Sequence, residues 1–253
     1  MKFGVIGLGK IGYGNRIKTN SSHFANYINN KNYSLEFLVE RNVSKYLFLK
    51  KKFKNKVYKN IKYLNEKNKV DILSICVPPE QSLNTIKTLN KKKLIPKYLI
   101  LEKPISNKLD EIIQIKKILK NKIVFINLQR IFDKNFLNLV EKNYKSLILS
   151  YNGGLINNGI HALSLLIYLH GYPKKIEKIN SNLNNTKNKD TSYSFLLKFK
   201  NFEAVFLGYD NLKFNKFDFE FIGRNNVLLL RTGGTKNIIE KITKYPGLQN
   251  YKI

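Results

Sequence analysis

Three glycines near the start of the chain have the spacing of a turn that holds a phosphate. Gly7, Gly9 and Gly12 follow the apolar run 3–6, and a Gly-x-Gly-x-x-Gly turn between a buried strand and a helix is typical of dinucleotide-binding folds. Gly7 permits the tight turn, Gly9 lets the backbone approach a pyrophosphate, and Gly12 lets the helix pack closely on the strand. The pyrophosphate would accept hydrogen bonds from N–H groups at the helix N-terminus. Alone this spacing is a weak signal, so its context decides.

A carboxylate further along suits the same chemistry. Glu40 lies at the end of a second expected strand, 33–39, where dinucleotide folds use an acidic residue to accept hydrogen bonds from the adenosine ribose. Its charge would repel a 2′-phosphate, which favours NAD over NADP, although the neighbouring Arg41 would offset part of that repulsion. A solvated charge pair at a strand end remains the alternative interpretation.

One lysine and one histidine have side chains suited to moving protons and polarising carbonyl groups. Lys103 follows the apolar run 98–101, at the edge where open α/β sheets bind ligands, and its ammonium group can polarise a carbonyl oxygen. The unperturbed pKa of histidine lies nearest neutrality, so His161 is the natural acid or base, with a structural histidine at a helix start as the alternative. His23 is interpreted as a surface or cap residue, with a role in contacting a ligand as the alternative. His170 is interpreted as a C-terminal cap that interacts with the helix dipole.

Strands and helices alternate through the first half of the chain. Strands are expected at 3–6, 33–39, 57–58, 70–77, 98–101 and 122–127, and helices at 15–30, 43–53, 61–66, 80–90 and 107–119. Within the first helical segment, the polar stretch 19–22 predicts an insertion or a second helix start, because such side chains cap helices. The alternation predicts an α/β fold with a parallel, doubly wound sheet.

The second half has a different pattern. Strands are expected at 147–151, 192–199, 202–209, 216–222 and 227–231, with an apolar helix at 160–169 and a surface loop at 180–190. Phe217, Phe219 and Phe221 alternate with Asp218 and Glu220, a period of two that indicates a sheet with one covered face. We therefore expect two domains, 1–122 and 123–253.

Composition limits the class of protein. The 253 residues are 43% hydrophobic and carry a net charge of +29. Because only five of the 46 basic residues are arginine, which nucleic-acid sites favour, we expect no specific nucleic-acid partner. The single cysteine, Cys76, excludes an intramolecular disulfide and is expected to be a buried thiol. No apolar run reaches the ~20 residues of a membrane helix, and no signal peptide is evident, so we expect a cytoplasmic protein without membrane contact.

Taken together, the motifs resemble those of the Gfo/Idh/MocA family of NAD(P)-dependent oxidoreductases, which includes glucose-fructose oxidoreductase and inositol dehydrogenase. The clearest match is Glu102-Lys103-Pro104, which reproduces the family's Glu-Lys-Pro motif. The stretch 153–161 is similar to the Asp-x-x-x-His active-site motif. The glycine turn, Val77-Pro78-Pro79 and the stretch 127–133 also agree in order and spacing, over roughly residues 1–175.

The resemblance implies a Rossmann-type NAD(P)-binding domain followed by an α+β domain with an open, mainly antiparallel sheet. It implies hydride transfer between nicotinamide and a sugar, nucleotide sugar or cyclitol, with no metal. The expected cofactor-binding residues are Gly7, Gly9, Lys10, Ile11, Gly12, Glu40, Arg41, Val77, Pro78, Glu102 and Lys103. The expected substrate-binding residues are Lys103, Gln129, Arg130, Asn157 and His161, of which Lys103, His161 and Asn157 are the catalytic ones.

The sequence departs from the family pattern in three ways. Asn157 stands where the family has an acidic residue, and Ser164 where an aspartate is common. The chain is also shorter than most members, so we expect a shortened second sheet, which in the family commonly forms the homo-oligomer interface. The alternative function is a catalytically weak dinucleotide-binding sensor, like the galactose-regulon repressor. A cofactor-retaining glycosidase or epimerase and a nucleic-acid binder rank below it.

Overall fold

The computed structural model describes residues 1–14, 22–140, 144–179, 190–231 and 236–241. By its internal contacts the chain divides into two units, Met1–Asn127 and Leu128–Ile253. Each unit has its own sheet, and the two are described separately below.

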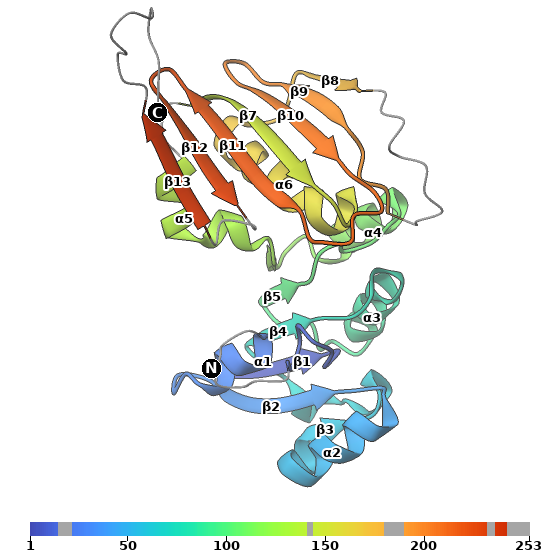
Figure 1. Ribbon diagram of the computed structural model, residues 1–253. Coiled ribbons are helices and arrows are strands. Elements are labelled where there is room, and N and C mark those ends of the chain that lie inside the picture. Colours follow the sequence, from blue (N-terminus) through green and yellow to red (C-terminus); the bar gives the residue numbers. More distant parts are fainter. Residues whose placement is uncertain (15–21, 141–143, 180–189, 232–235, 242–253) are drawn as a thin grey trace, which may run out of the picture. The chain divides into compact units, whose positions relative to one another are not determined.

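The first unit is built on a six-stranded sheet in the order β3-β2-β1-β4-β5-β6 (Figure 1). Every pair of neighbouring strands is parallel, as the alternation of strands and helices predicts. The strands are β1 (Lys2–Ile6), β2 (Ser34–Val39), β3 (Val57–Tyr58), β4 (Ile72–Ile75), β5 (Tyr98–Leu101) and β6 (Ile123–Ile126). The helices are α1 (His23–Ile28), α2 (Val43–Phe53), α3 (Pro79–Lys91) and α4 (Leu109–Ile118), with 3-10 turns η2 (Lys54–Lys56), η3 (Ile61–Tyr63) and η4 (Glu66–Asn68).

Helices cover both faces of this sheet. On one face, Phe24 of α1 and Leu49 of α2 pack with Phe3 and other side chains of β1 and β2. On the other, Ile86 of α3 and Ile115 of α4 pack with side chains of β4 and β5. The strand order reverses between β1 and β4. In doubly wound sheets, ligands bind at the carboxyl ends of the strands beside such a reversal.

The segment after the glycine turn differs from the expected long helix. Tyr13 donates its N–H to the carbonyl of Gly9 at 3.1 Å, which closes a turn, and α1 begins only at His23. Ser22 is its N-cap, and the Ser22 hydroxyl accepts the Ala25 N–H at 3.2 Å. A helix start at the polar stretch 19–22 is therefore confirmed at Ser22, while residues 15–21 lie outside the described part.

The second unit contains a seven-stranded sheet in the order β13-β12-β11-β7-β10-β9-β8. Only β10 and β7 pair in parallel among its described strands, which confirms a mainly antiparallel sheet. The strands are β7 (Tyr144–Tyr151), β8 (Lys175–Lys178), β9 (Phe195–Lys198), β10 (Glu203–Gly208), β11 (Phe217–Gly223), β12 (Asn226–Arg231) and β13 (Lys236–Lys241). The helical segments are η5 (Gln129–Phe132), α5 (Lys134–Val140), the π-helical turn η6 (Leu155–Gly159) and α6 (Ile160–His170).

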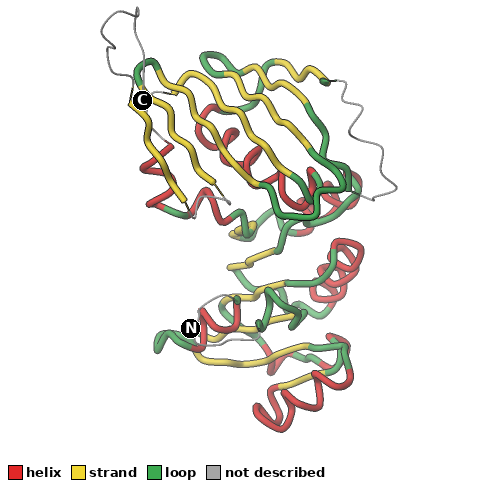
Figure 2. The backbone as a smooth tube through the Cα atoms, in the orientation of Figure 1, coloured by secondary structure: helices red, strands yellow, loops and turns green. Residues whose placement is uncertain are grey.

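Helix α6 lies along one face of this sheet (Figure 2). Its Leu165 and Leu166 are fully buried in a core that includes Phe219 and Phe221 of β11, as the period of two predicts. Asp218 differs from the pattern, because it is only 8% exposed. Its carboxylate accepts a hydrogen bond from the Lys216 ammonium at 2.6 Å and forms an ion pair with Arg231. These two contacts offset the cost of burying the negative charge.

One α-helix and two strands of the described residues were not expected from the sequence: α5, β8 and β13. Strand β6 pairs with β5, so it belongs to the first unit, and the structure divides the chain after Asn127 rather than after 122.

Within the described residues, no helix combines the length and apolar character that crossing a membrane would require.

Candidate functional site

The expected cofactor-binding residues of the first unit gather at the carboxyl ends of its parallel strands. The glycine turn follows β1 directly, and the Gly7 N–H donates to the carbonyl of Val39 at the end of β2 at 3.0 Å. Glu40, the next residue, accepts the Leu8 N–H on Oε2 at 3.2 Å and the Asn42 N–H on Oε1 at 2.8 Å. The carboxylate predicted to bind a ribose is therefore fixed against the glycine turn.

Two of the three glycines are required by the fold itself. Gly7 has φ +83°, and a Cβ on it would collide with the carbonyl of Cys76. A Cβ on Gly12 would collide with the carbonyl of Gly7, whereas a Cβ on Gly9 would meet no atom within 4 Å. No protein atom therefore requires a glycine at position 9, and the open space beside it suits the close approach of a ligand.

Val77 and Pro78 follow β4, which lies beside β1 at the reversal of strand order. The Cys76 N–H donates to the carbonyl of Ile6 at 2.7 Å, which holds this segment next to the glycine turn. The guanidinium of Arg41 donates a hydrogen bond to the side chain of Gln81 on α3 at 2.8 Å.

Glu102 and Lys103 continue from β5, and the Glu102 N–H donates to the carbonyl of Ile75 at 3.1 Å. Burial raises the pKa of Glu102, but hydrogen bonds from His23 and Asn127 and the positive charges of His23 and Lys103 outweigh it, so the pKa lies below its ordinary value. The carboxylate beside the candidate catalytic lysine is therefore ionised at neutral pH.

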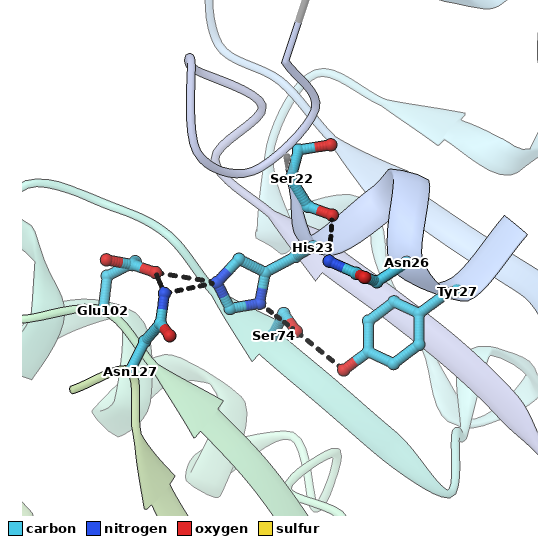
Figure 3. Close-up of polar contacts among 7 residues, drawn as sticks. All are labelled: Ser22, His23, Asn26, Tyr27, Ser74, Glu102 and Asn127. Atoms are coloured by element: carbon cyan, nitrogen blue, oxygen red, sulfur yellow. Dashed lines mark hydrogen bonds and ion pairs between the residues drawn. The ribbon is translucent and has the colours of Figure 1, made fainter. Parts of the chain in front are cut away.

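His23 contacts the candidate site residue Glu102 (Figure 3), a contact that sequence reasoning missed. The interpretation as a surface or cap residue is wrong, because His23 is only 9% exposed and its Nε2 lies 2.7 Å from Oε1 of Glu102. The two residues are 79 positions apart, so no local pattern could pair them.

The side chains of His23, Cys76 and Glu102 also place three potential ligand atoms within 4.8 Å of one another. The hydrogen bonds of His23 and Glu102 already engage both imidazole nitrogens and one carboxylate oxygen. Burial raises the pKa of the Cys76 thiol far above its ordinary range, so the thiolate needed as a ligand is disfavoured. The arrangement is that of a hydrogen-bonded network.

In the second unit, Asn157 and His161 lie on one continuous helical run that starts after β7. Gly153 and Gly154, with φ +81° and +90°, turn the chain from β7 into η6. His161 follows Asn157 by four positions, a spacing that makes side chains neighbours on a helix surface. Ser164, at the position of the common aspartate, donates its hydroxyl to the carbonyl of His161 at 3.1 Å.

Asp190 holds the start of this helical run. Its Oδ1 accepts the Ile156 N–H at 2.9 Å and its Oδ2 the Asn157 N–H at 2.8 Å. Ser192 adds a hydroxyl that accepts the Gly154 N–H at 3.0 Å. Sequence reasoning placed Asp190 in a surface loop, and no signal in the sequence links it to a turn 33 residues earlier.

The remaining candidates of the second unit have packing contacts. The Arg130 guanidinium lies 4.7 Å from the ring centroid of Phe136 and 6.0 Å from that of Phe217. The side chain of Gln129 lies outside the described part. His170 stacks on Phe202 with ring centroids 4.0 Å apart, and burial lowers its pKa, so the neutral imidazole is favoured over the expected charged cap.

Comparison with known proteins agrees with this geometry. Residues 1–128 match the family model GFO_IDH_MocA, described as an oxidoreductase family with an NAD-binding Rossmann fold. None of the curated proteins matches the chain.

Several solved structures share the fold at low sequence identity. The dehydrogenase MviM from Clostridium difficile has a TM-score of 0.72 and 17% identity, over 95% of this chain and 82% of that one. UDP-N-acetylglucosamine 3-dehydrogenase GnnA from Acidithiobacillus ferrooxidans has a TM-score of 0.71 and 12% identity, over 100% of this chain and 82% of that one. The WlbA dehydrogenase from Chromobacterium violaceum, in complex with NADH and UDP-GlcNAcA, has a TM-score of 0.69 and 11% identity, over 92% of this chain and 74% of that one.

Proposed function

The chain belongs to the Gfo/Idh/MocA oxidoreductase family, and on that basis we propose that it oxidises or reduces a hydroxyl/ketone pair of a sugar, nucleotide sugar or cyclitol. The observation that carries the proposal is the grouping of the glycine turn, Glu40 and Glu102-Lys103 at the carboxyl ends of β1, β2 and β5. This is the position where doubly wound sheets bind dinucleotides. GnnA and WlbA, which act on or bind nucleotide sugars, support the substrate class.

The residues present fit a nicotinamide dinucleotide. A Cβ on Gly9 would meet no atom within 4 Å, which leaves room for a pyrophosphate to approach, and the N–H groups of Lys10 and Ile11 in the turn would be its donors. Glu40 retains lone pairs for ribose hydroxyls after accepting two backbone N–H groups. The bound cofactor would supply or accept the hydride.

NAD is the preferred form of the cofactor in this proposal. The Glu40 carboxylate, 8% exposed, is held beside the glycine turn and would repel a 2′-phosphate. Arg41, the residue that would counter this repulsion, donates to Gln81 instead.

The protein's own side chains would handle the proton and the charge on the substrate oxygen. In the oxidative direction, His161 takes the hydroxyl proton and the Lys103 ammonium stabilises the negative charge that develops on that oxygen. In the reductive direction, His161 returns the proton. Asn157 donates or accepts a hydrogen bond with a neighbouring hydroxyl, which orients a polyhydroxylated substrate.

A second candidate, a dinucleotide-binding sensor with little catalysis, is favoured by one observation. Asn157 cannot accept a proton, and the Ser164 hydroxyl is bonded to the backbone of its own helix. The two positions that the family commonly fills with acids therefore carry no carboxylate.

Cofactor titration followed by a substrate panel separates the two functions. NADH binding is measured by nicotinamide fluorescence, and sugars, nucleotide sugars and cyclitols are then tested for a change in nicotinamide absorbance. Lys103→Ala is expected to abolish turnover and to leave NADH affinity within a few-fold, while Lys97→Ala, at the opposite end of β5, is the control. Wild-type rates in Lys103→Ala would defeat the catalytic assignment, and NADH binding without turnover on any substrate would favour the sensor.

A further inference from the structure

Helix α2 exposes apolar side chains on the face where a surface helix is ordinarily polar. The helix packs on the first sheet through Leu49, which is fully buried, and through the partly buried Tyr46 and Phe53. Leu47 and Phe48 point away from that core, with exposed fractions of 52% and 60%. The packing of α2 on its own sheet therefore does not account for these two side chains.

The spacing of the residues builds this face from two adjacent rows of the helix. Val43, Leu47 and Lys51 follow one another at intervals of four, and Phe48 is followed four residues later by Lys52. Residues four apart are neighbours on a helix surface, and all five are exposed. In both rows apolar side chains come first and a lysine follows one turn later. We call these five residues the outer face of α2.

The charge around the outer face of α2 is positive throughout. The segment 41–65 contains nine basic residues and no acidic one, although the whole chain has 17 acidic residues. Lysines in the last turn of a helix also interact favourably with the helix dipole. That effect accounts for Lys51 and Lys52 but leaves the exposed Leu47 and Phe48 unexplained.

An anionic lipid surface fits this combination of side chains. Phenylalanine and leucine of an amphipathic helix enter the boundary between headgroups and acyl chains, while lysines on the same helix are attracted to anionic headgroups. A protein partner fits less well, because a standard protein interface uses about 20–30 residues a side. The outer face of α2 is much smaller than that, and a lipid surface requires no complementary shape.

The position of α2 is compatible with such a contact. The helix begins at Val43, three residues after Glu40, and leads to β3, the edge strand of the first sheet (Figure 1). Because β2 and β3 are parallel, α2 returns the chain from the carboxyl end of one strand to the amino end of the next. Leu47 and Phe48 therefore lie further along the helix, away from the sheet edge that carries the candidate cofactor site.

We propose that the outer face of α2 binds the surface of anionic membranes, with Leu47 and Phe48 inserted at the level of the headgroups and Lys51 and Lys52 next to anionic lipids. Such a contact needs no spanning helix. It differs from the expectation of no membrane contact, which rested on the absence of a long apolar run and of a signal peptide. It does not depend on the proposed function, because these four residues are not part of the candidate site.

A single tryptophan reports on insertion, because the chain contains none. Phe48→Trp places the reporter on the outer face of α2. Ile113→Trp is the matched control, since Ile113 is 56% exposed on α4, whose first turn carries Asp110 and Glu111. With vesicles of phosphatidylcholine and phosphatidylglycerol in equal parts, the emission of Phe48→Trp is expected to shift to shorter wavelength. Phosphatidylcholine vesicles should leave it unchanged, and neither vesicle should shift Ile113→Trp.

Co-sedimentation with the same vesicles separates insertion from attraction between charges. The double variant Leu47→Ser/Phe48→Ser keeps the net charge, yet it should reduce the bound fraction several-fold at physiological salt, where attraction between exposed charges is screened. Lys51→Glu/Lys52→Glu should also reduce binding. Ile113→Ser is the control and should bind as wild type does, and thermal melts verify that each variant is folded.

Several outcomes would overturn the proposal. One is an equal emission shift in Phe48→Trp and Ile113→Trp, or no shift in either. Another is unchanged sedimentation of Leu47→Ser/Phe48→Ser. A shift of Phe48→Trp with polyglutamate but not with vesicles would assign the outer face of α2 to an acidic protein partner instead, and a dimer that Leu47→Ser/Phe48→Ser dissociates would assign it to a second copy of the chain.

Discussion

The carboxylate of Asp190 holds the backbone of Asn157, because Asp190 Oδ2 accepts the Asn157 N–H at 2.8 Å. The Asp190 carboxylate follows α6 in the chain and accepts the backbone N–H groups of Ile156 and Asn157. It therefore caps the helical run that carries Asn157 and His161.

Asp190→Ala is expected to lower the free energy of unfolding by about 1 kcal/mol, the typical effect of removing an N-cap. It should also reduce kcat, since the turn that carries Asn157 loses two hydrogen bonds. Asp190→Asn, which keeps one acceptor, should lie between wild type and Asp190→Ala. Chemical denaturation and steady-state kinetics measure the two effects, and an Asp190→Ala variant with unchanged stability would contradict the capping role.

Gly9 and Gly12 should respond differently to added side chains. Gly9→Val is expected to block NADH binding without lowering the melting temperature, because a Cβ there meets only open space. Gly12→Ala should lower the melting temperature, since its Cβ collides with the carbonyl of Gly7. Fluorescence titration and thermal melts test the pair, and retained NADH affinity in Gly9→Val would disprove the pyrophosphate site.

Glu40→Gln should shift cofactor preference. Removing the charge while keeping an acceptor for a backbone N–H is expected to raise NADPH affinity relative to NADH by about tenfold, or about 1.4 kcal/mol. Glu36→Gln is the control, since Glu36 lies on the same strand in an ion pair with Lys2. An unchanged ratio of the two dissociation constants would argue against Glu40 as the ribose-binding residue.

His170 should make stability depend on pH. Burial lowers its pKa from 6.5 in the folded state, so the unfolded chain binds the proton more readily and acid favours unfolding. Stability is therefore expected to fall as the pH decreases from about 6.5 through the folded pKa. In His170→Phe, which keeps a ring against Phe202, the free energy of unfolding should change less with pH between about 7.5 and 5.5, the titration range of histidine. Equal slopes would contradict this assignment.

The local pattern predicts elements well where apolar residues are regular. The bounds of α2 and β5 agree with those expected, because each is flanked by clear polar or loop residues. Strand β8, Lys175–Lys178, was missed since its sequence KIEK is mostly charged, and its pairing with β9 is what makes it a strand.

The site was predictable only where a motif marks it. The glycine turn, Glu40 and Lys103 follow strand ends, so their shared edge follows from the parallel fold. His23 and Asp190 have no such marker, because their partners Glu102 and Asn157 are distant in sequence and are brought near only by the folded chain.

The position of β7 in its sheet has a consequence for synthesis. Both neighbours of β7, the strands β10 and β11, come later in the chain. On the ribosome, β7 emerges with two unpaired edges and keeps them until most of the second unit has followed, and exposed strand edges promote aggregation. The two edges of nascent β7 therefore need protection, as chaperones provide, until β10 and β11 have been synthesised.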